Sequence, residues 1–281
     1  MTSSGSAAGL GLLSAATWGG SDFVGGIGAR RSPALLVVIA GHAFSLLVML
    51  AACFAAHAAV PTPRCLFLAM LGGFEGSLAL TVFYRALAMG AMGLTAALTG
   101  LLTALVPVVF GLIHDGLPAP VTVFGLGMGC VAIWLISHAP TAKGAGTPPL
   151  ALLLGALAGV CFGAQMILFK LASSGGILWT TASARAAGVV ALLIVIAVRP
   201  PKGKWKGFWL TGIAAGMLDT IGILIYLRAT QLGRLDVASL VASLYPGGTI
   251  LLAALLLREW PTRRQMAGMA LALAAVALLS V

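Results

Sequence analysis

The chain has 281 residues, of which 60% are hydrophobic and only 8% are charged. Soluble domains carry about 25% charged residues, so this composition cannot cover a water-exposed surface and indicates an integral membrane protein. The formal net charge of +10 does not indicate nucleic-acid binding, because the basic residues lie between apolar runs and form no stripe with interleaved aromatic residues.

The apolar runs predict an all-α protein with ten transmembrane helices. A helix needs about 20 mostly apolar residues to span a bilayer. Breaks rich in proline and glycine, such as PTPR at 61–64 and LPAP at 117–120, separate runs of this length. The predicted spans are 8–28, 34–56, 66–89, 92–113, 119–138, 149–172, 177–198, 207–231, 235–257 and 262–280.

The two halves of the chain resemble each other. A shift of 143 residues, called here the repeat offset, places FYRALAMG (83–90) over YLRATQLG (226–233). The same shift places FGLGMGCVAIWLIS (124–137) over AGMALALAAVALLS (267–280). A nearly constant offset over several strips indicates an internal duplication.

The duplication predicts two five-helix repeats, at 1–138 and 149–281, joined by a linker at 139–148. Because five is an odd number, the second repeat must cross the membrane in the opposite direction to the first. Such inverted repeats are typical of secondary transporters.

Three acidic residues, Asp22, Glu75 and Asp219, fall inside predicted spans and away from their first and last turns. A charged residue at the centre of a membrane helix costs about 2.5–3.5 kcal/mol and is a functional candidate by default. Glu75 precedes Arg85 by about 15 Å of helix, half of a bilayer core of ~30 Å. Arg85 therefore marks an interface and Glu75 the midplane, and Asp219 stands in nearly the same relation to Arg228.

These acids predict proton coupling. Burial favours the protonated form of a carboxyl group, and a cationic substrate or a change in hydration favours release of the proton. We therefore interpret Glu75, Asp219 and Asp22 as proton-coupling or cation-attracting groups. The alternative is that they pair with Arg185, His42 or backbone groups and only contribute to packing.

The repeat distinguishes the acids from one another. Glu75 aligns with Leu218, and Asp219 aligns with Gly76, so the two acids are one residue out of step. We expect that one couples protons while the other only shapes the cavity, with Glu75 the first choice.

Asp22 aligns with Gln165 at the repeat offset, and the two offer an acceptor and an amide if both line a cavity. Asp22 is expected near the end of the first helix. A pair with Arg30 or Arg31 is the alternative to a role in the site.

Other polar and aromatic residues are candidates for the substrate cavity. Aromatic faces near an acid suit an organic cation, although aromatic residues also form belts at the membrane interfaces. A lone histidine within a span could relay protons or bond a neighbour. An arginine there could pair with an acid or bind a carboxylate or phosphate. The candidates are Trp18, His42, Tyr84, Gln165, Arg185, Tyr226 and Tyr245.

The sequence lacks the motifs of several other classes. It has no ATP-binding G-x-x-x-x-G-K-[ST] loop, no H-E-x-x-H or G-x-S-x-G, and no C-x-x-C pair. We therefore expect no enzyme activity, no metal site and no cofactor.

At WGGSDFVGG (18–26), FYRALAMG (83–90) and its echo at 226–233, the chain resembles the drug/metabolite transporter superfamily in its ten-helix EamA branch. Asp115 and Glu259 also match the place where the family often has an acid before the last helix of each repeat. The resemblance covers essentially the whole chain. It implies two inverted five-helix repeats around a central cavity with alternating access. Similar members export amino acids, metabolites or drugs, often against protons, and others import small solutes.

We therefore expect a proton-coupled secondary transporter of the cell inner (cytoplasmic) membrane that exports a small organic solute, amphipathic or cationic. The alternatives are an ion-independent importer or exchanger of metabolites, and a membrane-embedded enzyme or lipid-handling protein. The expected partners are the solute, protons and the lipid bilayer, without nucleic acid. The chain is expected to act as a monomer or a homodimer.

The distribution of Lys and Arg predicts the orientation. Most of them lie on the face opposite to the termini, in loops such as those at 29–33 and 199–206. The positive-inside rule then places both termini outside, whereas members of the resembled family often have cytoplasmic termini.

Overall fold

The computed structural model describes residues 3–89, 92–137, 148–202, 205, 207–257, 260 and 262–279. Helices make up nearly all of this described part, and no strand occurs in it. The predicted linker, 139–148, lies outside the described residues except for its last residue. The helices are α1 (Ser3–Arg31), α2 (Ala34–Ala55), α3 (Pro63–Met89), α4 (Met92–His114), α5 (Pro120–Ser137), α6 (Pro149–Ala172), η1 (Ser173–Gly175), α7 (Ile177–Val198), α8 (Phe208–Leu232), α9 (Leu235–Ala242), α10 (Tyr245–Leu257) and α11 (Arg263–Leu279).

The ninth predicted span, 235–257, is divided into α9 and α10. Pro246 has no backbone N–H and so cannot donate to the carbonyl of Ala242. The chain tightens there instead: the amide of Leu244 donates to Val241 O at 3.2 Å, and the amide of Gly247 donates to Leu244 O at 2.9 Å. The remaining predicted spans each coincide with a single helix to within a few residues.

Within the described residues, six stretches are long and apolar enough to cross a membrane. α1 is not among them, although it is 29 residues long. It contains many small and polar residues, and Ser14, Ser21 and Asp22 are buried inside the bundle. The six stretches are Ala34–Ala55, Pro63–Met89, Pro149–Gly175, Ile177–Val198, Phe208–Leu232 and Leu235–Leu256, and shorter apolar helices lie at Leu98–His114, Pro120–Leu135 and Met266–Ala275.

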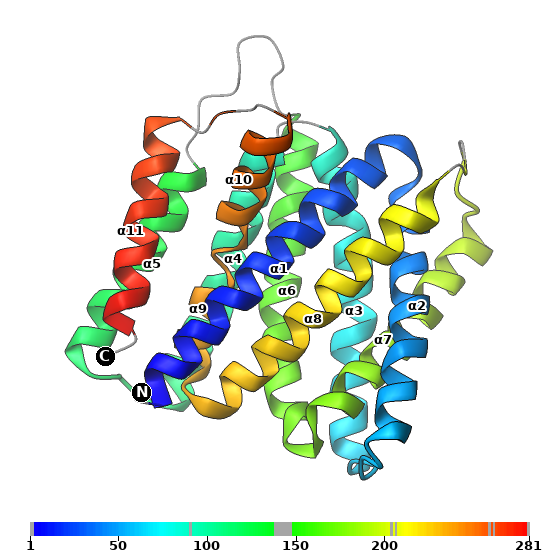
Figure 1. Ribbon diagram of the computed structural model, residues 1–281, viewed down its shortest axis with the longest axis horizontal. Helices are drawn as coiled ribbons and strands as arrows, with labels where there is room; N and C mark the ends of the chain where they lie inside the picture. The colour runs from blue at the N-terminus through cyan, green and yellow to red at the C-terminus, as the bar shows by residue number, and fades with distance from the viewer. Residues whose placement is uncertain are drawn as a thin grey trace.

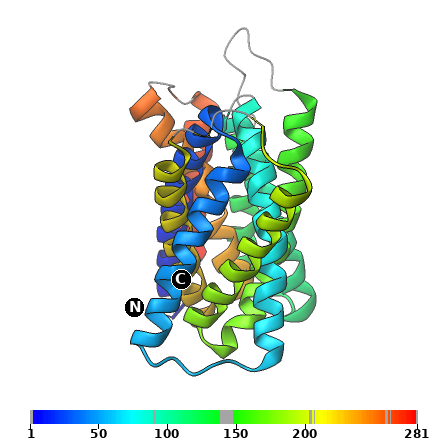
Figure 2. The same cartoon turned by 90° about the vertical axis from the view of Figure 1, so that its right-hand side faces the viewer.

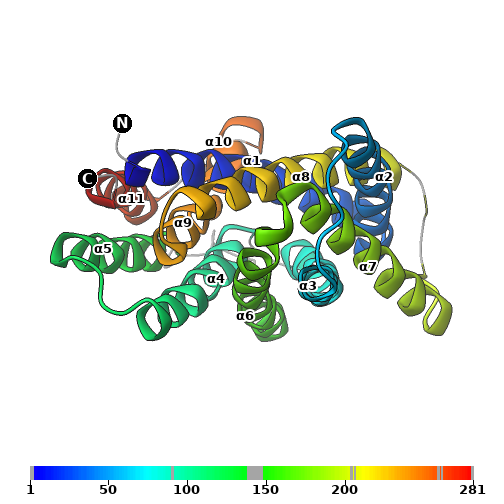
Figure 3. The same ribbon diagram turned by 90° about the horizontal axis from the view of Figure 1, so that it is seen from below.

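The helices pack so that the two halves of the chain interleave. α1 lies along α8 and crosses the bundle diagonally with it (Figure 1). α3 packs on both α6 and α7, and from below α3, α4 and α6 form the opposite side of the molecule from α1 and α8 (Figure 3). α5 pairs with α11 at the end where both termini lie. α2, α3 and α7 form the other end (Figure 2).

Glycines allow two pairs of these helices to meet backbone to backbone, as small residues do at helix contacts in lipid. A Cβ added at Gly216 would lie 2.3 Å from the Cα of Gly41, so α8 touches α2 there. A Cβ added at Gly73 would lie 2.1 Å from the carbonyl oxygen of Ala184, so α3 touches α7. The repeat offset places Gly73 over Gly216 and Gly41 over Ala184, so the two contacts correspond. They hold α2 and α7 against the centre of the bundle.

Candidate functional site

A cavity opens at the centre of the bundle and encloses about 600 Å³, counting the part open to solvent. Helices from both halves form its wall. The lining residues are Trp18, Asp22, His42, Gly76, Leu80, Thr103, Phe162, Gln165, Met166, Phe169, Arg185, Asp219, Ile223, Tyr226 and Tyr245.

Eight of the ten predicted site residues line this cavity, and Tyr84 and Glu75 do not. Tyr84 lies in the layer behind it, fully buried, with its hydroxyl 3.1 Å from Ser21 Oγ on α1. The eight are Trp18, Asp22, His42, Gln165, Arg185, Asp219, Tyr226 and Tyr245.

Glu75 lies at the edge of the contact between α3 and α6. Its carboxyl group contacts the thiol of Cys161 on α6, and its Oε1 atom is buried without a hydrogen-bond partner in the described residues. The cavity side of α3 is formed by the next residue, Gly76. One residue corresponds to a rotation of about 100° around a helix, so the Glu75 side chain is turned away from the cavity wall.

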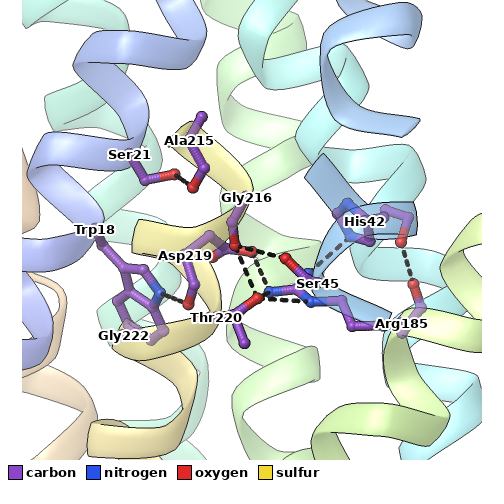
Figure 4. A network of polar contacts seen from close by, with 12 residues as sticks. Trp18, Ser21, His42, Ser45, Arg185, Ala215, Gly216, Asp219, Thr220 and Gly222 are labelled. Carbon is purple, nitrogen blue, oxygen red and sulfur yellow. Dashed lines mark hydrogen bonds and ion pairs between the residues drawn. The ribbon is translucent and has the colours of Figure 1, made fainter. Parts of the chain in front are cut away.

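Arg185 on α7 is the centre of a polar network on the cavity wall (Figure 4). Only 3% of the residue is exposed. Its Nη2 atom donates to Asp219 Oδ2 at 2.6 Å and to Thr220 Oγ1 at 2.9 Å, and its Nε atom donates to the same hydroxyl at 3.2 Å. The guanidinium is therefore tied to two neighbouring residues of α8 by charge-assisted hydrogen bonds, the stronger kind.

The same network determines the protonation of His42. Arg185 Nη1 lies 2.8 Å from His42 Nε2. A guanidinium has only donors, so Nε2 must accept the hydrogen bond and carries no proton. The proton is then on Nδ1, which donates to Val38 O at 3.1 Å. In this arrangement His42 is a neutral acceptor that holds the arginine and adds no charge to the cavity.

An aromatic group lies beside the charged residues. The ring centroid of Trp18 is 5.7 Å from that of Tyr226 and 6.5 Å from that of Tyr245, which it meets edge to face. The indole Nε1 atom donates to the backbone oxygen of Asp219 at 3.3 Å. Trp18 and Asp22 are four residues apart on α1, so they share one face of the helix.

Asp22 is 6% exposed and lies inside α1, which continues to Arg31. Asp22 is nearer the C-terminal end of α1 than its start, but about 13 Å of helix separate it from Arg31, so the alternative of an ion pair at the helix end is not supported. The two ion pairs in the described part of the chain are Arg185–Asp219 and Arg234–Asp236. Neither involves Asp22, whose charged neighbour is the like charge of Asp219.

Several contacts of the site recur at the repeat offset. His42 and Arg185 correspond to each other in the two halves and are in direct contact. Gln165 Nε2 donates to Gly72 O at 2.9 Å, and Ser21 Oγ donates to Ala215 O at 2.9 Å. The two accepting positions, 72 and 215, are related by this offset, whereas the two donors, Gln165 and Ser21, are one residue out of step.

The sequence predictions missed Thr220, which holds the arginine. Its hydroxyl donates to Gly216 O at 2.7 Å and accepts from Arg185. Its counterpart in the first repeat is Ser77, whose hydroxyl donates to Gly73 O. A small hydroxyl residue at the same position of both repeats was the available signal.

Comparison with known proteins supports the fold and the family. Residues 149–281 match the EamA-like transporter family. A solved structure described only as "Crystal structure of protein" is similar to this chain, with a TM-score of 0.76 and 18% identity over 98% of each chain. At that identity the similarity shows the fold alone. No curated protein matched the sequence. The match of residues 149–281 thus supports a place for this chain in the drug/metabolite transporter superfamily, and the EamA-like family within it comprises multi-pass membrane transporters of small solutes.

Proposed function

We propose that the protein is a ten-helix secondary transporter of the inner membrane that exports a small organic solute, amphipathic or cationic, in exchange for protons. The observation that carries this proposal is the central cavity, which has two carboxyl groups and one guanidinium in its wall: Asp22, Asp219 and Arg185. Ionisable groups inside a membrane bundle mark substrate and proton pathways.

Alternating access of two inverted five-helix repeats, at 1–138 and 149–281, is the proposed mechanism. Its support is the way contacts recur when the halves are exchanged. The contact of α1 with α8 corresponds to that of α6 with α3, and the contact of α2 with α8 corresponds to that of α7 with α3. Two repeats that rock against each other around a fixed site require such a frame.

The preference for a cation follows from the charges of the cavity wall. Its carboxylates are Asp22 and Asp219, and its one guanidinium is Arg185, among the described lining residues. With His42 neutral, the wall has an excess of negative charge when both carboxyls are ionised. Glu75 lies outside this lining, so the proposed mechanism does not use the coupling role that the sequence predicts for it.

The test is proton movement in proteoliposomes that contain a pH-sensitive dye. We expect an outward substrate gradient to move protons inward for one class among amino acids, quaternary amines and sugar phosphates. Solute flux without proton movement would instead indicate the ion-independent importer or exchanger. A reaction product from purified protein and lipid would indicate an enzyme.

The blocking variant is Gly76→Phe, since a Cβ at Gly76 would already lie 1.7 Å from Gln165 Nε2 in the cavity wall. We expect it to abolish flux. Gly127→Phe is the matched control, because Gly127 is exposed and a Cβ there meets nothing within 4 Å. Equal flux in both variants would contradict translocation through this cavity.

A further inference from the structure

We infer that Asp22 is the exchange site of the cavity, where an organic ammonium ion and a proton bind one at a time, while Arg185 keeps Asp219 occupied. This inference rests on the proposed function and names the substrate class and the exchanging group. The sequence alone ranked Glu75 first, and the structure changes that order through the contacts of each carboxyl group.

Asp219 already has its counter-ion. Its Oδ2 atom accepts a hydrogen bond from Arg185 at 2.6 Å. The side chain of Arg185 is 4% exposed and that of Asp219 is 16% exposed. Separating a buried ion pair leaves two uncompensated charges out of water, which is strongly unfavourable. Thr220 and His42 hold the guanidinium from two further directions. A cation that entered the cavity would have to displace a charge that is held by three residues.

Asp22 has no such partner among the ion pairs of the described residues. A carboxylate in a buried site without a counter-ion is unfavourable, so the group binds either a proton or a cation. The titratable groups that face it from neighbouring helices, or across the cavity, are Asp219 on α8, Tyr84 on α3, Tyr245 on α10, His42 on α2 and Arg185 on α7. The only cation in this set, Arg185, is already committed to Asp219.

The aromatic group indicates which cation fits. Trp18 lies one turn from Asp22 on the same face of α1, and Tyr226 and Tyr245 flank its ring. Indole and phenol faces attract an ammonium ion, and they also accept apolar substituents. A carboxylate one helical turn from an indole that two phenol rings flank suits an ammonium ion that carries an apolar or aromatic group. A hydrated metal cation gains little from such a wall.

The exchange is balanced in protons and charge. With Asp22 protonated the carboxyl is neutral, and no cation is held. When the ammonium ion binds, the proton leaves for the water of the cavity and the carboxylate pairs with the cation. The ammonium ion therefore replaces the proton at the oxygen atoms of Asp22, so the site cannot carry both at once.

The test measures binding and needs no flux. Benzyltrimethylammonium is titrated into purified protein in nanodiscs, in buffers of different ionisation enthalpy, over a pH range of about 5 to 9. We expect release of about one proton per cation bound at pH values where the free site is protonated. Neopentylbenzene, the uncharged carbon counterpart of the probe, should release none.

Two variants identify the residue that releases the proton. In Asp22→Asn, we expect binding weaker by about tenfold to a hundredfold, because a charged partner is lost, and no proton release. Glu75→Gln is the matched change of a carboxyl to an amide outside the cavity lining, and it should keep both. Unchanged release in Asp22→Asn, or lost release in Glu75→Gln, would overturn the inference. If Asp22→Asn does not fold, two other measurements decide. Absence of proton release from the wild type at every pH overturns the inference, and retained proton release in Asp22→Glu supports it.

The result separates this inference from the proposed function. Proton-linked binding at Asp22 without flux would contradict transport and leave the site intact. Proton-coupled flux with full proton release in Asp22→Asn would support transport and refute the site.

Discussion

The α8 wall and the α3 wall of the cavity lie at corresponding positions of the two halves, yet only the α8 wall carries charge. Asp219 on α8 corresponds to Gly76 on α3, where the amide of Gln165 occupies the space of the absent side chain. Arg185 beside α8 corresponds to His42, which is neutral and accepts a hydrogen bond from it. The backbone frame is thus repeated while the chemistry is not. The two proposed repeats therefore differ in the side chains that they place at equivalent positions of the cavity wall.

The largest expected effect comes from removing the charge of Arg185, the counter-ion of Asp219 on α8. In Arg185→Gln, Asp219 loses its counter-ion at a buried site. We expect a loss of about 3–5 kcal/mol in the free energy of unfolding, since breaking a buried pair costs that much. Thermal unfolding of the purified protein would measure it.

Two further variants make this result specific. Arg185→Gln with Asp219→Asn removes the pair as a whole and should recover most of the stability. Arg228→Gln changes an exposed arginine that bonds Gln231, and should stay within about 0.5 kcal/mol of the wild type. A double variant as unstable as the single one would mean that the guanidinium stabilises the fold through Thr220 and His42 instead.

The repeated frame predicts equal effects on the two walls. Gly216→Ala directs a Cβ into the backbone of Gly41, and Gly73→Ala directs one into the backbone of Ala184. Neither neighbour can rotate away, so we expect each to cost about 1–3 kcal/mol, as overpacking does. Denaturant unfolding of both variants in the same detergent tests the comparison. A large cost in one and none in the other would show that the two crossings are not equivalent.

Smaller effects are expected from the paired hydrogen bonds to backbone. Gln165→Leu removes a donor to Gly72 O, and Ser21→Ala removes a donor to Ala215 O. Each should cost about 1 kcal/mol, the usual net value of one hydrogen bond. Thermal shifts of similar size would support the correspondence. A Ser21→Ala effect several times larger would mean that its contact with Tyr84 dominates.

The helices were predictable because bilayer thickness sets the length of an apolar run. The break before α10 had a signal in the sequence as well, because Pro246 lies inside the ninth predicted span and cannot donate a backbone hydrogen bond there. The spacing of Glu75 from Arg85 gave the depth of the acid in the membrane but not the direction in which it points. The direction depends on packing, and the neighbouring glycines 72, 73 and 76 were the sequence sign of the packed face. The contact between Arg185 and His42 could also have been expected, since copies of one position meet at the axis that relates two repeats.

The smallest effect is expected at Glu75, the acid that the sequence alone favours. Glu75→Gln replaces a half-buried carboxyl group beside Cys161 by a neutral amide of the same shape. The cavity lining does not include this side chain, so we expect proton-driven flux within about twofold of the wild type, the effect of less than about 0.5 kcal/mol. Flux in proteoliposomes under an imposed pH gradient measures it, with Asp22→Asn as the variant that should lose coupling. Loss of coupling in Glu75→Gln alone would mean that α3 rotates during transport and brings its acid to the cavity. The α3 wall would then carry a charge in another state of the cycle, and the asymmetry of the two walls would be a property of one conformation only.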